Sequence, residues 1–270
     1  MLPKETEQII DQYRSEGYII PHPSLIKTPE QIEGIRESGK ITTQILDLVE
    51  KEIKPGMTTA EVDKLVYDYT IAHNAIPAPL NYMGFPKSVC LSINDVVCHG
   101  IPDDKTVLKS GDIVNVDVST ILNGYFSDAS RMFMIGNVSP SAKALVQTAK
   151  ECLEIGTKQV RPFNSTNEIG RAIEPYANQR GYTVVRDLGG HGVGLKFHED
   201  PHIDHFAKRN KGVLMLPGMV FTIEPMINAG GYSVKVAKDN WTVTTRDGSL
   251  SAQWEYTIAV TKDGYEILAQ

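Results

Sequence analysis

Cysteine is scarce in this chain, whose 270 residues include only Cys90, Cys98 and Cys152. The count is odd and no CxxC pair occurs, so we expect neither a disulfide framework nor a zinc site built on cysteines. No apolar run is long enough to span a membrane. The charged N-terminus also lacks the apolar segment of a signal peptide. We therefore expect a cytoplasmic protein that does not bind a membrane.

Clusters of lysine and arginine are also missing. The net charge is −6 and the sequence pI is about 5.7. A specific nucleic-acid ligand is not expected, because binding a phosphate backbone needs concentrated positive charge. Hydrophobic residues make up 41% of the chain, enough for a sizeable core in one large domain or two small ones.

Helical patterns come early in the chain and again near its middle. Residues 5–20 predict a short amphipathic helix, with Ile9, Ile10 and Tyr13 on one side and prolines after it. A second helix is expected over 28–53, because Thr28-Pro29-Glu30-Gln31 combines an N-cap, a first-turn proline and a capping box. A third helical pattern covers 140–159.

An internal repeat connects the two halves of the chain. Residues 54–62 (KPGMTTAEV) resemble residues 161–169 (RPFNSTNEI) at an offset of 107 positions. Each segment follows a helical pattern and is expected to open a further helix with a capping box, Thr58 to Glu61 and Ser165 to Glu168. Chance similarity of two helix starts is the alternative to duplication. Two similar halves that face each other would form a cleft between them.

Strand patterns follow each group of helices, which predicts an α+β fold with a mostly antiparallel or mixed sheet. Strands are expected at 182–186, 219–227, 232–237 and 252–260. Residues 112–134 predict a hairpin that turns at Asn123-Gly124. In that register Asp128 faces Ser119, and Asp117 is a diagonal neighbour of Asp128 on the same face. A slip of one residue would put the two carboxylates on opposite faces.

Acidic residues and histidines stand inside segments that otherwise predict burial. They are Asp117, Asp128, Glu224 and Glu255, with His191 in a glycine-rich segment and His198 seven residues later. Buried carboxylates usually pair or bind metal. Four carboxylates and one imidazole favour a divalent ion, Mn, Fe, Co or Zn, and the two hairpin carboxylates could reach one such ion or share two. The other histidines, His22, His73, His202 and His205, are interpreted as surface or core residues.

Six segments in order resemble the bacterial type 1 methionine aminopeptidases, which have the pita-bread fold. They are residues 81–88, 92–102, 114–117, 190–194, 221–225 and 251–255. The resemblance implies a creatinase/aminopeptidase-like fold with two pseudo-symmetric halves around a central, mostly antiparallel sheet. It implies a single catalytic domain over 25–270 and leaves residues 1–24 as an N-terminal extension.

The resemblance also implies roles for single residues. Asp117, Asp128, His191, Glu224 and Glu255 would be ligands of two metal ions, with Asp128 and Glu255 bridging them. Asp117 would complete one ion, and His191 with Glu224 would complete the other. A bridging water would attack the peptide carbonyl.

Three of these roles concern proton transfer and the substrate. Glu224 would also act as general base and acid. His198 would stabilise the oxyanion, and His99 would contact the scissile amide.

A pocket for the methionine side chain is implied at Tyr82, Phe85, Cys90, Phe197 and Trp241, which without the resemblance would be interpreted as core residues. A monovalent cation, Na⁺ or K⁺, is implied at Asn94, Val96 and Ser251. The chain departs from the common family pattern at Pro79, Met83 and Phe126-Ser127, so its pocket rim differs.

The implied activity is removal of the first methionine from nascent proteins and peptides whose second residue is small. The expected partners are nascent N-termini, the protein is expected to be a monomer, and contact with the ribosome stays open. The alternatives are an X-Pro aminopeptidase or creatinase-like hydrolase, and a binding protein of this fold that has lost its metal.

Overall fold

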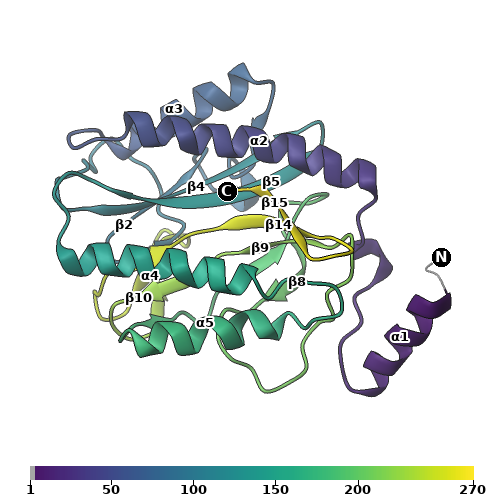
Figure 1. The fold of residues 1–270 in the computed structure, drawn as a ribbon. Helices are drawn as coiled ribbons and strands as arrows, with labels where there is room; N and C mark the ends of the chain where they lie inside the picture. Colours follow the sequence, from purple (N-terminus) through teal and green to yellow (C-terminus); the bar gives the residue numbers. More distant parts are fainter. Residues whose placement is uncertain (1–3) are drawn as a thin grey trace.

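The computed structural model describes residues 4–270 (Figure 1). Its helices are α1 (Lys4–Ser15), α2 (Pro29–Glu52), α3 (Thr59–Ala72), α4 (Pro140–Thr157) and α5 (Asn167–Gln179), with short 3-10 turns at Pro23–Leu25 and Tyr82–Gly84. The strands of the first half are β1 (Ile76–Pro77), β2 (Cys90–Ile93), β3 (Val96–Cys98), β4 (Ile113–Leu122) and β5 (Tyr125–Met134). The later strands are β6 (Thr183–Val184), β7 (Gly190–Gly192), β8 (Glu199–Ile203), β9 (Val220–Ile223), β10 (Met226–Asn228), β11 (Val234–Val236), β12 (Val243–Thr245), β13 (Ser251–Gln253), β14 (Tyr256–Val260) and β15 (Tyr265–Ala269).

The helix α2 begins and ends where the sequence predicts. Thr28 Oγ1 accepts the Gln31 N–H, and the Gln31 side chain accepts the Thr28 N–H, which completes the capping box. Ile35, Ile45 and Val49 are fully buried on the face that packs against β4 and β5. This face therefore anchors α2 on the sheet that carries Asp117 and Asp128.

The hairpin β4–β5 has the predicted register over its whole length. Leu122 pairs with Tyr125, and Ser119 pairs with Asp128. Asn123 and Gly124 both have positive φ, 52° and 84°, as the type I′ turn requires. The turn fixes the register, and the register fixes the face on which both carboxylates lie.

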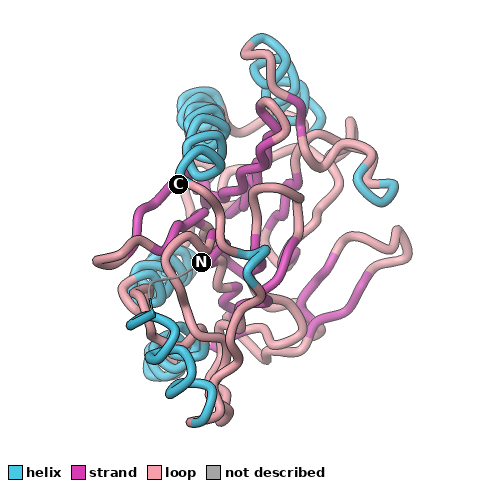
Figure 2. The backbone as a smooth tube through the Cα atoms, turned by 90° about the vertical axis from the view of Figure 1, so that its right-hand side faces the viewer, coloured by secondary structure: helices cyan, strands magenta, loops and turns pink. Residues whose placement is uncertain are grey.

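The named strands form four antiparallel sheets rather than one. The first sheet joins β1, β2 and β5 to β4, and the largest has the order β15-β14-β9-β7-β8. An antiparallel bridge between Ser130 in β5 and Glu255, just before β14, connects these two sheets. The expected central antiparallel surface is therefore present, but it is assembled from separate sheets. Figure 2 shows the long helices on one side of the strands.

The two halves repeat the same local structure at the predicted offset of 107 positions. Thr58 bridges Val107 in the first half, and Ser165 bridges Leu214 in the second, so both partners are displaced by 107. The starts of β4 and β9 are also 107 positions apart. Agreement in pairing as well as in sequence supports duplication over chance similarity.

The second capping box is a prediction that the structure contradicts. α5 begins at Asn167 with Thr166 as N-cap, and no side chain caps it. The Ser165 hydroxyl instead donates to the Lys211 carbonyl and accepts the Asn167 N–H, and Glu168 pairs with Arg171. The Ser165 hydroxyl is therefore used by Lys211 and Asn167 rather than by the Glu168 N–H, so the capping box does not form.

Two expected strands, 219–227 and 252–260, are each divided into two. The chain leaves β9 at Ile223 and joins β10 at Met226, in a different sheet. In the same way, it leaves β13 at Gln253 and joins β14 at Tyr256. Both changes of sheet occur inside continuous apolar segments, which is why hydrophobicity alone did not reveal them. The strands at 182–186 and 232–237 are shorter than expected.

The N-terminal helix α1 ends at Ser15, five residues before the predicted end, and Gly17 follows with φ 89°. The Tyr13 ring stacks on Phe163 at a centroid distance of 6.1 Å and meets Tyr18 edge-on at 5.1 Å. Ile19 then forms a parallel bridge with Val213. Residues 13–19 are therefore packed on the second half.

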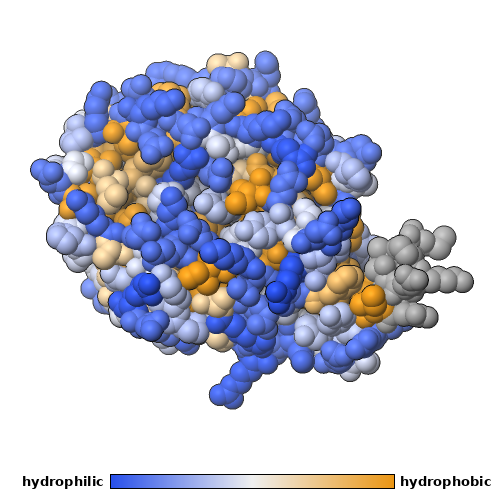
Figure 3. All heavy atoms as spheres, viewed as in Figure 1, coloured by the Kyte–Doolittle hydropathy of each residue, from blue (hydrophilic) through white to orange (hydrophobic). Residues whose placement is uncertain are grey.

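The molecular surface seen from the helix side is mostly hydrophilic, with apolar residues in small groups (Figure 3). Within residues 4–270, no helix is both long and apolar enough to cross a membrane.

Candidate metal centre and substrate cavity

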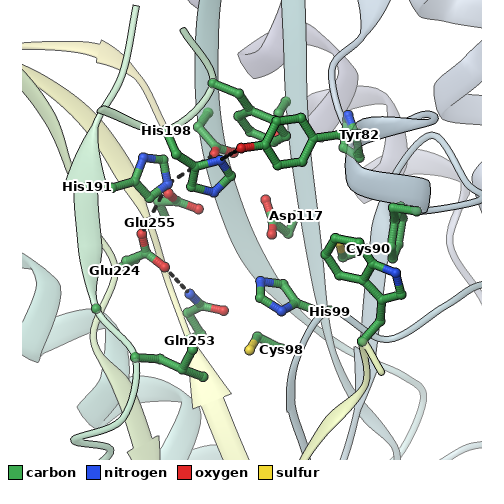
Figure 4. Close-up of a pocket in the computed structure, with 18 of the residues that line it drawn as sticks. Tyr82, Cys90, Cys98, His99, Asp117, His191, His198, Glu224, Gln253 and Glu255 are labelled. Carbon is green, nitrogen blue, oxygen red and sulfur yellow. Dashed lines mark hydrogen bonds and ion pairs between the residues drawn. The ribbon is translucent and has the colours of Figure 1, made fainter. Parts of the chain in front are cut away.

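A cavity of about 390 Å³ opens where the sheets of the two halves meet. It is lined by all twelve residues that the sequence assigned to metal, catalysis or the methionine pocket: Tyr82, Phe85, Cys90, His99, Asp117, Asp128, His191, Phe197, His198, Glu224, Trp241 and Glu255. Figure 4 shows His191, Glu224 and Glu255 on one side and Cys90 on the other, with Asp117 and His99 between them. The structure thus brings together residues spread over two-thirds of the chain.

The first half supplies its carboxylates from the hairpin. Ser119 donates a hydrogen bond of 2.8 Å to Asp128 Oδ1, as their facing positions allow. Asp117 lies on the same face, and its Oδ1 is buried without a hydrogen-bond partner among the described residues. A buried carboxylate oxygen with no donor is the expected state of an atom that a cation would contact.

The second half supplies Glu224 and Glu255 from the two points where the chain changes sheet. Glu224 occupies the position 107 residues after Asp117, so the duplicated halves contribute equivalent carboxylates. Thr222 Oγ1 donates to Glu224 Oε1 at 2.7 Å, and Gln253 Nε2 donates to Oε2 at 3.0 Å. These bonds fix the plane of the Glu224 carboxylate within the cavity.

The histidine His191 lies on β7 between two glycines that allow close backbone approach. A Cβ atom at Gly190 would lie 2.4 Å from Thr222 O, and one at Gly192 would lie 2.1 Å from Asp200 O. His191 Nδ1 lies 3.0 Å from the Gly192 carbonyl, and this contact requires a proton on Nδ1. Nε2 therefore carries the lone pair that a metal needs.

The ligand atoms converge on one point. His191 Nε2 lies 3.7 Å from both Asp128 Oδ2 and Glu224 Oε1. Asp128, His191 and Glu255 each offer an atom within 4.8 Å of the others. Oxygen atoms and one imidazole nitrogen suit divalent ions of intermediate softness.

The cavity brings four carboxyl groups together without a cationic side chain beside them. Burial raises the pKa of Asp117 to about 6 and that of Glu224 to about 8. Burial and the neighbouring carboxylates raise the pKa of Asp128 and Glu255 well above their usual range. Among the described residues that line the cavity, none is lysine or arginine. The donor set therefore fits two divalent cations, which would supply the missing positive charge.

Two further histidines face the same cavity. Burial lowers the pKa of His198 to about 4 and also lowers that of His99, so both rings are neutral at pH 7. The Tyr82 hydroxyl lies 3.1 Å from His198 Nδ1. When Tyr82 donates this bond, Nε2 of His198 is left as an N–H donor. His99 has φ 56°, a left-handed backbone conformation that is often found at functional sites.

The side chains expected to hold methionine form a mostly apolar wall. The rings of Phe85 and Trp241 meet edge-on at 5.2 Å, and those of Tyr82 and Phe197 do so at 4.9 Å. Cys90 is buried between the wall and Asp117, with which it pairs across β2 and β4. Cys98 and Met226 also line the cavity, and the sequence reading did not include them.

The rim residues that depart from the family pattern lie at the mouth of this cavity. Pro79 and Met83 line it, and the Met83 side chain is 82% exposed. Phe126 stacks on Phe197 at 6.1 Å. The entrance is thus bordered by apolar side chains at Pro79 and Met83, with Phe126 behind Phe197.

The residues expected to bind a monovalent cation also lie close together. Ser251 N donates to the Asn94 carbonyl at 2.8 Å, and Val96 begins β3 two positions after Asn94. The Ser251 hydroxyl is buried without a hydrogen-bond partner in the part of the chain that the structure describes. Cation binding here stays a prediction.

Sequence reasoning missed several residues that support the site. His205 is fully buried, and its Nε2 accepts the Glu224 N–H at 3.1 Å, while His202 lines the cavity mouth. Thr222 and Gln253 stand two positions before Glu224 and Glu255. The two-residue period of a strand was therefore a usable signal for both.

Comparison with known proteins gives the family. The model of metallopeptidase family M24 matches residues 33–262. The chain belongs to metallopeptidase family M24. Methionine aminopeptidase A of Synechocystis is 50% identical over 238 residues, which cover 88% of this chain and 94% of that protein. Methionine aminopeptidase of Escherichia coli is 47% identical over 244 residues, which cover 90% and 92%.

Solved structures of family M24 proteins agree with this assignment. The crystal structure of methionine aminopeptidase from Rickettsia prowazekii superposes with a TM-score of 0.89 at 49% identity, covering 91% of this chain and 99% of that one. An X-Pro aminopeptidase from Thermotoga maritima gives a TM-score of 0.72 at 21% identity and is covered over only 62% of its length. The second likeness shows a shared pita-bread fold alone.

Proposed function

We propose that this protein is a methionyl aminopeptidase, which hydrolyses the first peptide bond of chains that begin with methionine and continue with a small residue. One observation carries the proposal: all five proposed ligand residues line a single cavity beside a largely apolar wall, and three of them have ligand atoms within 4.8 Å of one another. The curated relatives of similar length carry the same name. The binding-protein alternative is disfavoured because the ligand set is complete.

Asp117, Asp128, His191, Glu224 and Glu255 would hold two divalent ions, with Asp128 and Glu255 shared between them. Bound there, the ions would polarise the scissile carbonyl and supply an activated water. The metals are expected among Co, Mn, Fe and Zn, and Na⁺ or K⁺ is proposed at Asn94, Val96 and Ser251.

The chain's own residues bind the substrate and move its proton. Tyr82, Phe85, Cys90, Phe197 and Trp241 would enclose the methionine side chain, since an unbranched thioether fits irregular apolar space well. The free α-amine would lie near the metal ions. An acetylated N-terminus cannot occupy that position.

Three side chains would act on the scissile bond. Glu224 takes a proton from the attacking water and returns it to the leaving amine, which is the work of a general base and acid. His198 Nε2–H donates to the developing oxyanion, and His99 contacts the scissile amide.

Wider assignments rest on the proposed activity. Nascent N-termini would be the substrates, with the ribosome as a neighbour, and the protein would act as a cytoplasmic monomer. Residues 25–270 would form one catalytic domain and 1–24 an extension to it, in line with the family match beginning at residue 33.

A substrate panel with metal control tests the proposal. Metal-stripped protein should be inactive, and Co²⁺ or Mn²⁺ should restore it. The reconstituted enzyme should cleave a Met-Ala tripeptide and spare the Met-Lys, Lys-Ala and acetyl-Met-Ala peptides. Equal kcat/KM for Lys-Ala and Met-Ala would overturn methionine specificity, and full activity without metal would overturn the mechanism.

A further inference from the structure

A buried lysine lies behind the cavity, outside its lining. Lys27 is only 4% exposed, although lysine is among the residue types least often buried. Its Nζ contacts Glu199 Oε2 at 2.5 Å, and the two side chains are 1% and 9% exposed. The partners are 172 positions apart, so the pair connects the start of α2 to the second half.

The other oxygen of Glu199 holds the loop that carries His198. Glu199 Oε1 accepts the N–H of Leu195 at 2.7 Å and the N–H of Lys196 at 2.9 Å. The next two residues are Phe197 and His198, which both line the cavity. The Glu199 carboxylate, at the first residue of β8, thus holds the middle of the short loop between β7 and β8.

The start of α2 is itself held firmly. The Lys27 N–H donates to the Gly218 carbonyl at 2.8 Å, and the α2 capping box follows immediately. Lys27 Nζ therefore projects from an ordered backbone. Because its contact with Glu199 is a buried, charge-assisted hydrogen bond, it is strong and directional.

We propose that Lys27 and Glu199 are positioning residues for His198 in the peptide hydrolysis proposed above. Neither side chain lines the cavity. Lys27 fixes the Glu199 carboxylate, Glu199 fixes the loop backbone, and the backbone sets where the His198 imidazole meets the substrate carbonyl. A misplacement of about 1 Å at a reacting group can cost on the order of 10²-fold in rate.

The test is a double-mutant cycle with Lys27→Met and His198→Ala. We expect Lys27→Met alone to lower kcat on a Met-Ala tripeptide by about 10- to 10²-fold, while bound metal per chain stays unchanged. In the His198→Ala background the same change should alter kcat less than about 2-fold, because the group that it positions is gone. A purely structural role would lower kcat by the same factor in both backgrounds.

Stability is measured alongside, because removing one partner leaves a buried charge. Glu199→Gln provides a second variant. Glutamine has nearly the shape of glutamate, and its side-chain oxygen can still accept the N–H groups of the loop. Lys64→Met, which breaks an exposed pair with Asp68, is the matched control and should leave kcat unchanged.

The outcomes separate this inference from the proposed activity. If the wild-type protein cleaves no methionyl peptide, the proposed function fails before any variant is compared. If the wild type cleaves but the losses are equal in both backgrounds, or kcat does not change, the positioning role is overturned alone. Failure of both variants to fold at the assay temperature would also overturn it, in favour of a structural role.

Discussion

Glu224 makes hydrogen bonds with three residues that support the site. Its carboxylate accepts from Thr222 and Gln253, and its N–H donates to His205. Replacing it with glutamine would set an amide N–H₂ against one of these donors and would remove the proposed base. We expect Glu224→Gln to lower kcat by at least about 10²-fold.

This prediction is checked by steady-state kinetics at saturating metal. The exposed Glu37→Gln variant serves as the charge-matched control. Near-normal turnover of Glu224→Gln would reject the proton-transfer role.

The two histidines His191 and His198 should respond differently to truncation, although their rings are only 4.2 Å apart. His191→Ala removes a ligand and should weaken binding of one metal ion. His198→Ala should leave metal content intact and lower turnover by roughly 10²–10³-fold, as for loss of an oxyanion donor. Elemental analysis of bound metal, together with kinetics, tests these roles in both variants. If His198→Ala lost metal and His191→Ala kept it, the two roles would be exchanged.

The titration of buried groups predicts how stability depends on pH in the metal-stripped protein. Glu224, with its pKa raised to about 8, holds a proton that the unfolded chain releases near the ordinary value of 4.5. The contribution of the protonated Glu224 to the stability of the folded protein is therefore lost as the pH rises toward 8. The histidines act oppositely, because burial lowers the pKa of His191 and His205 to about 3. The protein therefore loses their contribution to its stability only when the pH falls below 6.5, the ordinary pKa of histidine.

Above pH 6.5 the histidines are neutral in both states, so only the carboxylates act. We expect the unfolding free energy of stripped protein to fall between pH 6.5 and 8, by about 1.4 kcal/mol per pH unit for each retained proton. Urea denaturation at pH 6.5 and at pH 8 measures this change in unfolding free energy. In metal-loaded protein the fall should vanish, since bound cations favour the ionised carboxylates. A flat profile in stripped protein would contradict the raised pKa values.

At the scale of elements, the clearest predictions came from signals in neighbouring residues, although the Ser165–Glu168 capping box did not form. The Asn123-Gly124 turn and the Thr28 cap are decided by neighbouring residues, so the hairpin register and the start of α2 follow from the sequence. The short strands β1, β3 and β12 depend on partners far along the chain. Nothing in their few residues distinguishes them from loops.

The site shows the same division. Four of the five proposed ligands stand out because they are acidic residues that interrupt apolar segments, and His191 stands out because glycines surround it. Lys27 and His205 do not, because their partners Glu199 and Glu224 lie on other elements. Even the changes of sheet beside Glu224 had only one local signal, Pro225, which lacks the N–H needed to continue a ladder.

The contact of α1 with the second half predicts a stabilising role without a catalytic one. Tyr13 packs on Phe163 and Tyr18, while none of the three lines the cavity. We expect Tyr13→Ala to lower the unfolding free energy by about 1–2 kcal/mol and to leave kcat/KM unchanged. Tyr67→Ala, on an exposed part of α3, is the control. Reduced activity at temperatures where the variant is folded would instead connect the extension to catalysis.

At the scale of the whole molecule, the site exists only where the two duplicated halves meet. Its proposed ligands run from Asp117 to Glu255, and the Ser130–Glu255 bridge joins the sheets that carry them. Each half closes most of its own contacts first, because nearby residues meet at lower entropic cost. The ligand atoms should therefore converge late.

A site that forms after the rate-limiting barrier has a kinetic consequence. Divalent metal should slow unfolding and leave the folding rate nearly unchanged, because the transition state would not yet contain the complete ligand set. Stopped-flow measurements with and without Mn²⁺ would show the effect in the unfolding limb alone. Metal binding would then stabilise the folded protein kinetically. Its lifetime before unfolding would depend on the metal concentration around it.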